Sequence, residues 1–441
     1  MNRLAGLLAV AGFGVLALGL SFDSLDTQGS AALALGFTLL ISHQAGLVAR
    51  TLGLPAITGY LLVGLFCGPY LLARVHPALA VLGSETVKTL RLFDAMALGM
   101  IALGAGGELR LQDLRANGWK ILTIILGQVG IVLPGIAALV WFGAPWLGLG
   151  EQGPTVLAVT ALMFGVVALT NSPAIVMAVI HEYRPRGPVT DTVLAVVVSM
   201  DVVVISLFTL SVSFGEFLLR PTGGLNAGNL LWLSWEILGS LGAGALLGWL
   251  VSQYLERSGS DAPLLILGVS FLAVTALPEL HLSGILALMV AGFFIENTTR
   301  HGEALFRSLD RHSLPVYLVF FTMAGAGINL DALRTAWPLA LALVSVRFAL
   351  IYAGTGLGTW VSKAGAAVKR YAWSGFVAQA GITLGLVVLV EKRLPELGGR
   401  ADTAMLAVVA LNQVIGPILF RLGLSWSGEI SPGKLSKPQP R

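Results

Sequence analysis

The chain has 441 residues, of which 56% are hydrophobic and 11% are charged, and its formal net charge is +4. This composition excludes a soluble globular protein, because a soluble fold of this size cannot bury so much apolar surface. It predicts an all-α polytopic membrane protein that is surrounded by membrane lipids. The small positive charge is expected to follow membrane topology, and we expect no nucleic-acid partner.

Apolar segments of about 20 residues, the length that spans a bilayer, predict about fourteen transmembrane helices. In chain order these lie at about 4–22, 31–49, 56–73, 90–107, 119–142, 155–180, 189–214, 229–251, 263–278, 281–296, 313–330, 337–360, 371–391 and 402–421. The first of them also fits a cleavable signal peptide, and we favour a retained helix. The Pro/Lys/Ser-rich tail at 422–441 is expected to be disordered.

The distribution of Lys and Arg predicts the orientation of these helices, since cytoplasmic loops are enriched in both residues. The cluster Lys363/Lys369/Arg370 and several others fall on one side of the map, whereas the loop 143–154 on the other side has no Lys or Arg. We therefore expect both termini to be cytoplasmic.

The order of the helices predicts two inverted repeats. Six helices (31–214), a single connecting helix (229–251) and six more (263–421) give two halves of opposite orientation, and the segment 1–30 adds an extra N-terminal helix. Transporters built in this way have their site near the midplane, where the halves meet. VVSMDVVV around Asp201 can be laid over VVALNQVI around Asn412, so these two side chains are predicted to occupy equivalent positions.

Asp201 lies midway along the segment 189–214, with no other fully charged residue near it. A carboxylate at the centre of a bilayer costs roughly 3 kcal/mol on insertion scales, and intramembrane charges usually have a function. We therefore expect Asp201 to bind a transported proton or cation. The polar residue Ser199 belongs to the same expected site.

Interrupted helices are predicted at the fifth helix of each half. The run Thr170-Asn171-Ser172-Pro173 combines three hydrogen-bonding side chains with a helix breaker, and Gln379 precedes Ala380-Gly381 in the second half. Breaks at both positions would bring free carbonyl groups and helix ends to the membrane centre, where they can coordinate a cation. The alternative is a simple proline kink, with the Ser and Thr side chains bonded back to their own helix.

Arg347 is too deep in its predicted helix to reach water easily, and it cannot lose its charge. One interpretation is structural: it neutralises carbonyl ends or pairs with a carboxylate such as Glu108 or Asp201. The other is mechanistic, with Arg347 as a fixed positive charge that replaces the cation when the site is empty.

Nucleotide-binding and zinc-protease motifs are absent from the sequence, which has no G-x-x-x-x-G-K-[ST], no strand-bounded G-x-G-x-x-G and no H-E-x-x-H. We expect no nucleotide, no cofactor and no enzymatic activity. The one cysteine, Cys67, excludes an internal disulfide.

Several segments resemble those of the monovalent cation:proton antiporters, specifically the second cation:proton antiporter group. RTLGLPAITGYLLVGLFCGP resembles an early signature of that family, and MALGMIALGAGGEL, which contains Glu108, is similar to its F-x-x-G-L-E-L stretch. ILALMVAGFFIEN and LPVYLVFFTMAGAGINLDAL resemble later segments, and the likeness runs from about Leu35 to Phe420.

This resemblance implies an elevator-like antiporter that is a homodimer in a bacterial inner membrane. The dimerisation or scaffold helices would be 31–118 and 263–330, the core transport helices 119–214 and 337–421, and the linker 229–251. In the family, the cation and the proton compete for an aspartate at the position of Asp201. Arg347 stands where the family has Lys or Arg. The substrates would be H+ and either Na+ or K+.

One departure from the family pattern concerns stoichiometry. The family commonly has Asn, Asp or Gln before the aspartate, whereas this chain has Met200, which cannot carry a proton. A single carboxylate predicts electroneutral exchange of one cation for one proton. The alternatives are a Na+-coupled symporter of organic anions and an ion sensor without transport, both on the same fold.

Overall fold

The computed structural model describes residues 27–71, 82–107, 109–146, 149, 153–219, 227–258, 262–299 and 302–430. Within these ranges the secondary structure is entirely helical, with no β-strand. The predicted helix at 4–22, the tail beyond residue 430 and the candidate residue Glu108 lie outside the described residues.

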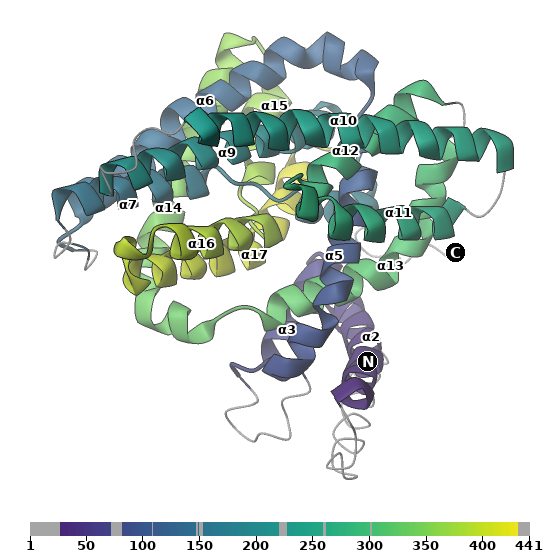
Figure 1. Cartoon of the computed structure of the whole chain (residues 1–441), viewed down its shortest axis with the longest axis horizontal. Helices are drawn as coiled ribbons and strands as arrows, with labels where there is room; N and C mark the ends of the chain where they lie inside the picture. Colours follow the sequence, from purple (N-terminus) through teal and green to yellow (C-terminus); the bar gives the residue numbers. More distant parts are fainter. Residues whose placement is uncertain are drawn as a thin grey trace.

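The helices follow the predicted order along the chain (Figure 1). They are α2 (Thr27–Thr51), α3 (Ala56–Cys67), α5 (Ser84–Gly107), α6 (Leu111–Gly143), α7 (Pro154–Ala168), α8 (Pro173–Tyr183), α9 (Pro188–Leu219), α10 (Ala227–Ser258), α11 (Ala262–Ala276), α12 (Gly284–Thr298), α13 (Gly302–Ala326), α14 (Leu330–Val361), α15 (Ala366–Tyr371), the 3-10 helix η5 (Ala372–Phe376), α16 (Gly381–Arg393) and α17 (Gly399–Trp426).

Seven helical segments in the described part are long and apolar enough to cross a membrane: Ala32–Thr51, Arg115–Gly143, Pro154–Tyr183, Pro188–Leu219, Ser234–Arg257, Leu330–Val361 and Gly399–Trp426. Shorter apolar helices lie at Ala56–Cys67, Leu265–Leu280, Gly284–Thr298 and Leu314–Ala326.

The ends of several helices differ from the sequence prediction. The helix expected from about 337 begins at Leu330, because Asn329 caps it by accepting the amide protons of Asp331 and Ala332, both at 3.0 Å. Likewise, α13 begins at Gly302, although its apolar part starts only at about 313. Hydropathy detects the apolar part of a helix, whereas capping and helix propensity determine where the helix ends.

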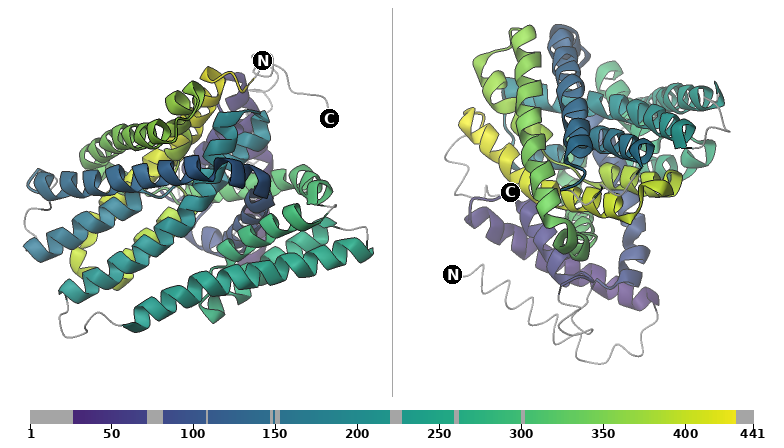
Figure 2. Two further views of the ribbon diagram at one scale, coloured as in Figure 1. Left: turned by 90° about the horizontal axis from the view of Figure 1, so that it is seen from above. Right: turned by 90° about the vertical axis from the view of Figure 1, so that its left-hand side faces the viewer.

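The helices pack as two groups. One contains α2, α3, α5, α11, α12 and α13, and the other contains α6 to α9 and α14 to α17 with η5. The long α10 follows the first group, packing mainly on α12, and Figure 2 shows it running along one side of the molecule.

Glycines allow close helix contact within the first group. A Cβ atom at Gly64 of α3 would collide with the carbonyl oxygen of Thr322 in α13, and one at Gly292 of α12 would collide with that of Leu103 in α5. Small residues at such crossings let helix backbones touch, which is how helices in lipid gain packing energy.

Candidate functional site

The first predicted break is present between α7 and α8. The helix stops at Ala168, residues 170–172 are not helical, and a new helix begins at Pro173. Ser172 caps this new helix by accepting the amide proton of Ile175 at 3.3 Å, and proline suits the first helical position because it has no amide proton to leave unsatisfied. The Ser-Pro pair therefore starts a helix here instead of kinking one.

The second break lies between η5 and α16, where residues 378–380 have no helical structure. No proline occurs in this stretch. The only sequence signals are the buried polar side chain of Gln379 and the flexible Ala380-Gly381 pair that follows it.

A buried hydrogen-bond network joins the two breaks. Gln379 Nε2 donates to the carbonyl oxygen of Val167 at 2.9 Å and to the hydroxyl of Thr170 at 2.7 Å, and Thr383 donates to the same hydroxyl at 2.9 Å. Thr170 in turn donates to Val167 O, near the end of α7, at 2.7 Å. Asn412 in α17 donates to Gln379 Oε1 at 2.7 Å. These contacts bring the polar side chains of Thr170, Gln379, Thr383 and Asn412 together.

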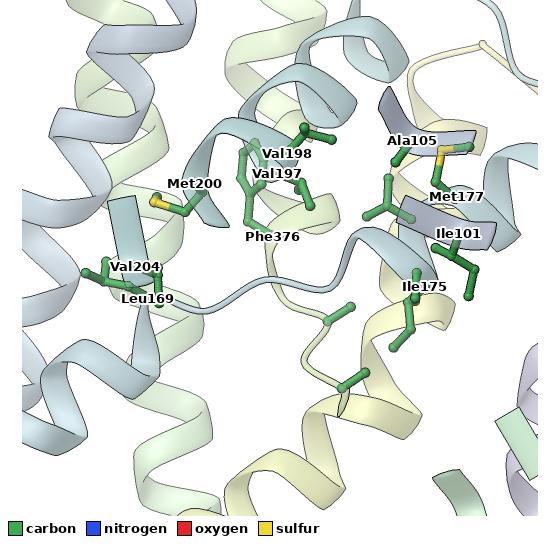
Figure 3. Packing of buried hydrophobic residues seen from close by; sticks show 14 of the residues in the cluster. Ile101, Ala105, Leu169, Ile175, Met177, Val197, Val198, Met200, Val204 and Phe376 are labelled. Carbon is green, nitrogen blue, oxygen red and sulfur yellow. The ribbon is translucent and has the colours of Figure 1, made fainter. Parts of the chain in front are cut away.

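Asn171 extends the contact between the breaks. With its side-chain nitrogen turned toward the second break, Asn171 donates to the carbonyl oxygen of Phe376 at 2.7 Å. In Figure 3 the extended chain between Leu169 and Ile175 passes close to the segment that follows Phe376. The backbones of the two interrupted helices therefore meet at one place.

Arg347 ties both breaks to α14. The residue is only 1% exposed. Its guanidinium donates to the carbonyl oxygens of Ala168 at 2.8 Å and Thr170 at 2.9 Å in the first break. It also donates to those of Val377 at 2.7 Å and Phe376 at 3.2 Å in the second. Of the two interpretations from the sequence, this geometry fits the neutralisation of helix carbonyl ends. The guanidinium forms no ion pair with Asp201 among the described residues.

Asp201 stands outside the network that Arg347 and Gln379 organise. The residue is 5% exposed, and its Oδ2 atom is buried with no hydrogen-bond partner in the described part of the chain. Its helix, α9, packs against α7, α8 and η5, the helices that flank the breaks. A buried carboxylate oxygen without a partner among the described residues is uncommon and requires an explanation.

The residues next to Asp201 are less polar. Met200 is completely buried, and Figure 3 shows its side chain on the side of α9 that faces Leu169. Ser199 is partly buried and does not join the network within the described residues.

A cavity of about 20 Å³ lies beside the breaks, with Arg347, Gln379 and the end of α7 in its wall. Its remaining lining is apolar and comes from Ile136, Phe164, Leu343, Met405 and Val408. Such a volume holds about one water molecule.

Sequence reasoning missed two polar residues of this region. Thr383 bonds to Thr170, and as a polar residue four positions after Gln379 in an apolar segment it could have been selected from the sequence. Gln413 is 1% exposed, and its Nε2 atom has no partner in the described part of the chain, like Oδ1 of the adjacent Asn412. An Asn-Gln pair within an apolar helix is itself a signal.

Comparisons with known proteins agree with this architecture. Residues 36–424 match the family model described as sodium/hydrogen exchanger, transmembrane. The Na(+)/H(+)-K(+) antiporter GerN of Bacillus cereus is 25% identical over 388 residues, which cover 87% of this chain and 93% of that protein. The Na(+)/H(+) antiporter of Enterococcus hirae is 24% identical over 413 residues, covering 89% of this chain and 97% of that protein.

The solved structure of the sodium proton antiporter MjNhaP1 from Methanocaldococcus jannaschii has a similar fold. The TM-score is 0.66 at 20% identity, over 92% of this chain and 98% of that one. The resemblance to cation:proton antiporters that the sequence motifs indicate is confirmed by the family match. Because this match covers most of the chain, the protein belongs to the transmembrane sodium/hydrogen exchanger family.

Proposed function

We propose that this protein exchanges a monovalent cation, Na+ or K+, for H+ across the membrane, and that Asp201 binds either ion in turn. The observation that carries the proposal is the buried Oδ2 of Asp201, which has no partner among the described residues and lies on a helix that packs against both interrupted helices. The names of the relatives, which are Na+/H+ and Na+/H+-K+ antiporters, support the same substrates.

Competition at a single carboxylate gives the exchange. A proton and a monovalent cation each neutralise Asp201, whereas the empty anion is expensive to move through an apolar barrier. The protein therefore changes conformation only when it is loaded, and one cation is exchanged for one proton. Met200 supports this stoichiometry, since the residue before Asp201 offers no second site for a proton.

Packing supports an elevator movement and inverted repeats. The helices proposed as scaffold, 31–118 and 263–330, pack with each other, as do the proposed core helices 119–214 and 337–421, with α10 as the linker. Helices of the first half also pack on helices of the second half. The second and third helices of one half contact the third and second of the other, since α3 packs on α13 and α5 packs on α12, and the two fourth helices, α6 and α14, pack on each other. This crosswise pattern is what a two-fold axis in the membrane plane would produce.

A small cation fits the described site better than an organic anion. The polar side chains at and around the breaks are few: Thr170, Asn171, Ser172, Ser199, Gln379 and Asn412. So short a list suits a small cation better than an organic anion, which makes the symporter the weaker alternative. An ion sensor would bind the cation without any flux of protons.

Purified protein in proteoliposomes with an acidic interior and a pH-sensitive dye tests this function. Na+, K+ or Li+ added outside is expected to alkalinise the interior for at least one of the three cations, because the cation displaces protons from the site. The rate is expected to stay the same when a membrane potential is imposed. Binding of a cation without proton flux would favour the sensor, and a voltage-dependent rate would exclude one-for-one exchange.

A further inference from the structure

We propose that the corner between α14 and α15 binds the phosphate headgroup of an anionic phospholipid. The corner holds a pocket of about 510 Å³, lined by Thr359, Trp360, Val361, Lys363, Ala364 and Lys369. This site is separate from the breaks and has no part in the exchange proposed for Asp201.

The two lysines give the pocket a positive charge. Lys363 and Lys369 are both exposed, and neither forms an ion pair with a carboxylate among the described residues. Arg370 follows directly, and its guanidinium lies 5.5 Å from the centre of the Tyr371 ring. An anion at this corner would therefore meet the two lysines of the pocket, with Arg370 beside Lys369 in the chain.

Lys363 lies just after the end of α14, with its backbone in the left-handed region. Lys363 donates its amide proton to Trp360 O at 3.2 Å, and Ala364 donates to Thr359 O at 2.9 Å, which is the usual reversal at the end of a helix. Glycine is the preferred residue at this position because φ is positive, and Lys363 has a φ of 54°. A lysine here is less favourable for the backbone than glycine, and Lys363 is one of the residues that line the pocket.

Aromatic and apolar side chains beside the pocket fit the rest of a lipid molecule. Trp360 is 67% exposed at the end of a helix of membrane length, and Tyr352 and Leu357 on the same helix are 54% and 45% exposed. Tryptophan and tyrosine gather at the membrane interface, where their rings lie at the depth of the headgroups. Acyl chains can pack along this face of α14 while the phosphate contacts the lysines.

The two lysines, together with the aromatic and apolar side chains beside them, favour an anionic lipid over a zwitterionic one. Lysines near a membrane attract anionic lipid, whereas the positively charged group of a zwitterionic headgroup would be repelled by the same lysines. A free phosphate ion shares the headgroup chemistry but gains nothing from Trp360 or the apolar face of α14. A lipid bound in the pocket would restrain the end of α14, the helix that carries Arg347.

Thermal unfolding of the full-length protein in detergent tests this site. Phosphatidylglycerol is expected to raise Tm, whereas phosphatidylcholine and inorganic phosphate at equal concentration are not. The double variant Lys363→Gln/Lys369→Gln is expected to bind phosphatidylglycerol about 30-fold more weakly, since each lysine near an anionic surface contributes roughly fivefold. Arg257→Gln, another basic residue at the membrane end of a helix, is the matched control and keeps the wild-type shift.

The variant Lys363→Gly separates lipid binding from folding. Glycine relieves the positive-φ backbone, so this variant is expected to be at least as stable as wild type without lipid, yet to gain less from phosphatidylglycerol. A double variant that keeps the full lipid-induced shift would overturn the proposal. An equal shift with inorganic phosphate would assign the pocket to a free anion and would equally overturn the lipid.

Discussion

Asp201 and Arg347 are both buried charges in apolar helices, and their surroundings are opposite. The guanidinium of Arg347 donates to four carbonyl oxygens, whereas the Oδ2 of Asp201 has no partner in the described part of the chain. A charge whose hydrogen bonds are satisfied is a fixed part of the structure. A carboxylate with a free oxygen is the group whose ligand can change, and this difference assigns the two residues different roles in the proposed exchange.

Arg347→Gln is expected to lower both stability and exchange. The substitution leaves buried carbonyl groups of both breaks without donors, at a cost on the order of 3 kcal/mol. Arg347→Lys keeps the charge but replaces a planar fork by a point charge, so it is expected to recover only part of the lost Tm. Thermal unfolding of both variants measures this. An Arg347→Gln protein with wild-type Tm would show that the guanidinium does not hold the breaks together.

The sequence revealed these residues but not their partners. A charge within an apolar segment is visible in the sequence, so Asp201 and Arg347 could both be selected. The carbonyl groups that Arg347 binds come from two breaks, one 30 residues away and the other almost 180 residues away in the chain. Because only the fold brings these carbonyl groups to Arg347, the sequence alone cannot decide between its structural and its mechanistic interpretation.

At the scale of helices, the first break could be predicted from the sequence more readily than the second. Ser172 and Pro173 are a known start signal for a helix, so the first break could be predicted with a mechanism. The second has no such signal, and Gln379 indicated it mainly through its place in the presumed repeat. Helix ends were predicted least well, because polar residues such as Asn329 extend helices beyond their apolar parts.

A helix-end contact that the sequence did not indicate joins the two packing groups. Glu182, at the end of α8, accepts the amide proton of Ala56 with both carboxylate oxygens, at 3.0 and 2.8 Å, and accepts Arg50 Nε at 2.8 Å. It thereby caps the start of α3 from the other group, with 7% of its side chain exposed. In an elevator movement this junction would have to open.

Glu182→Gln is expected to loosen this junction and to change the rate of exchange. Loss of the charge weakens the cap and the ion pair together, so hydrogen exchange at the first residues of α3 should become faster. Glu216→Gln is the control, because its partner Arg393 lies 2.8 Å away within the same packing group. If both variants changed transport equally, the junction would have no special place in the movement.

The whole molecule combines one group of closely packed helices with a second group that carries every described candidate residue. Hydropathy and the order of the segments predicted the chain of helices. The grouping of those helices came from resemblance to the antiporter family, since contacts such as α3 with α13 link segments about 250 residues apart. The membrane supplies the energetic reason for this arrangement, because backbone breaks are tolerated only where protein buries them.

Proton-coupled cation flux in Asp201→Asn tests the central claim most directly. Asp191→Asn, an exposed aspartate in the first turn of the same helix, is the control. Wild type and Asp191→Asn are expected to exchange ions, with an apparent KM for the cation that rises as the pH falls because protons compete for the same carboxylate. Asp201→Asn is expected to fold and to show no exchange at any pH. Cation-dependent proton flux that persists in Asp201→Asn would contradict the account.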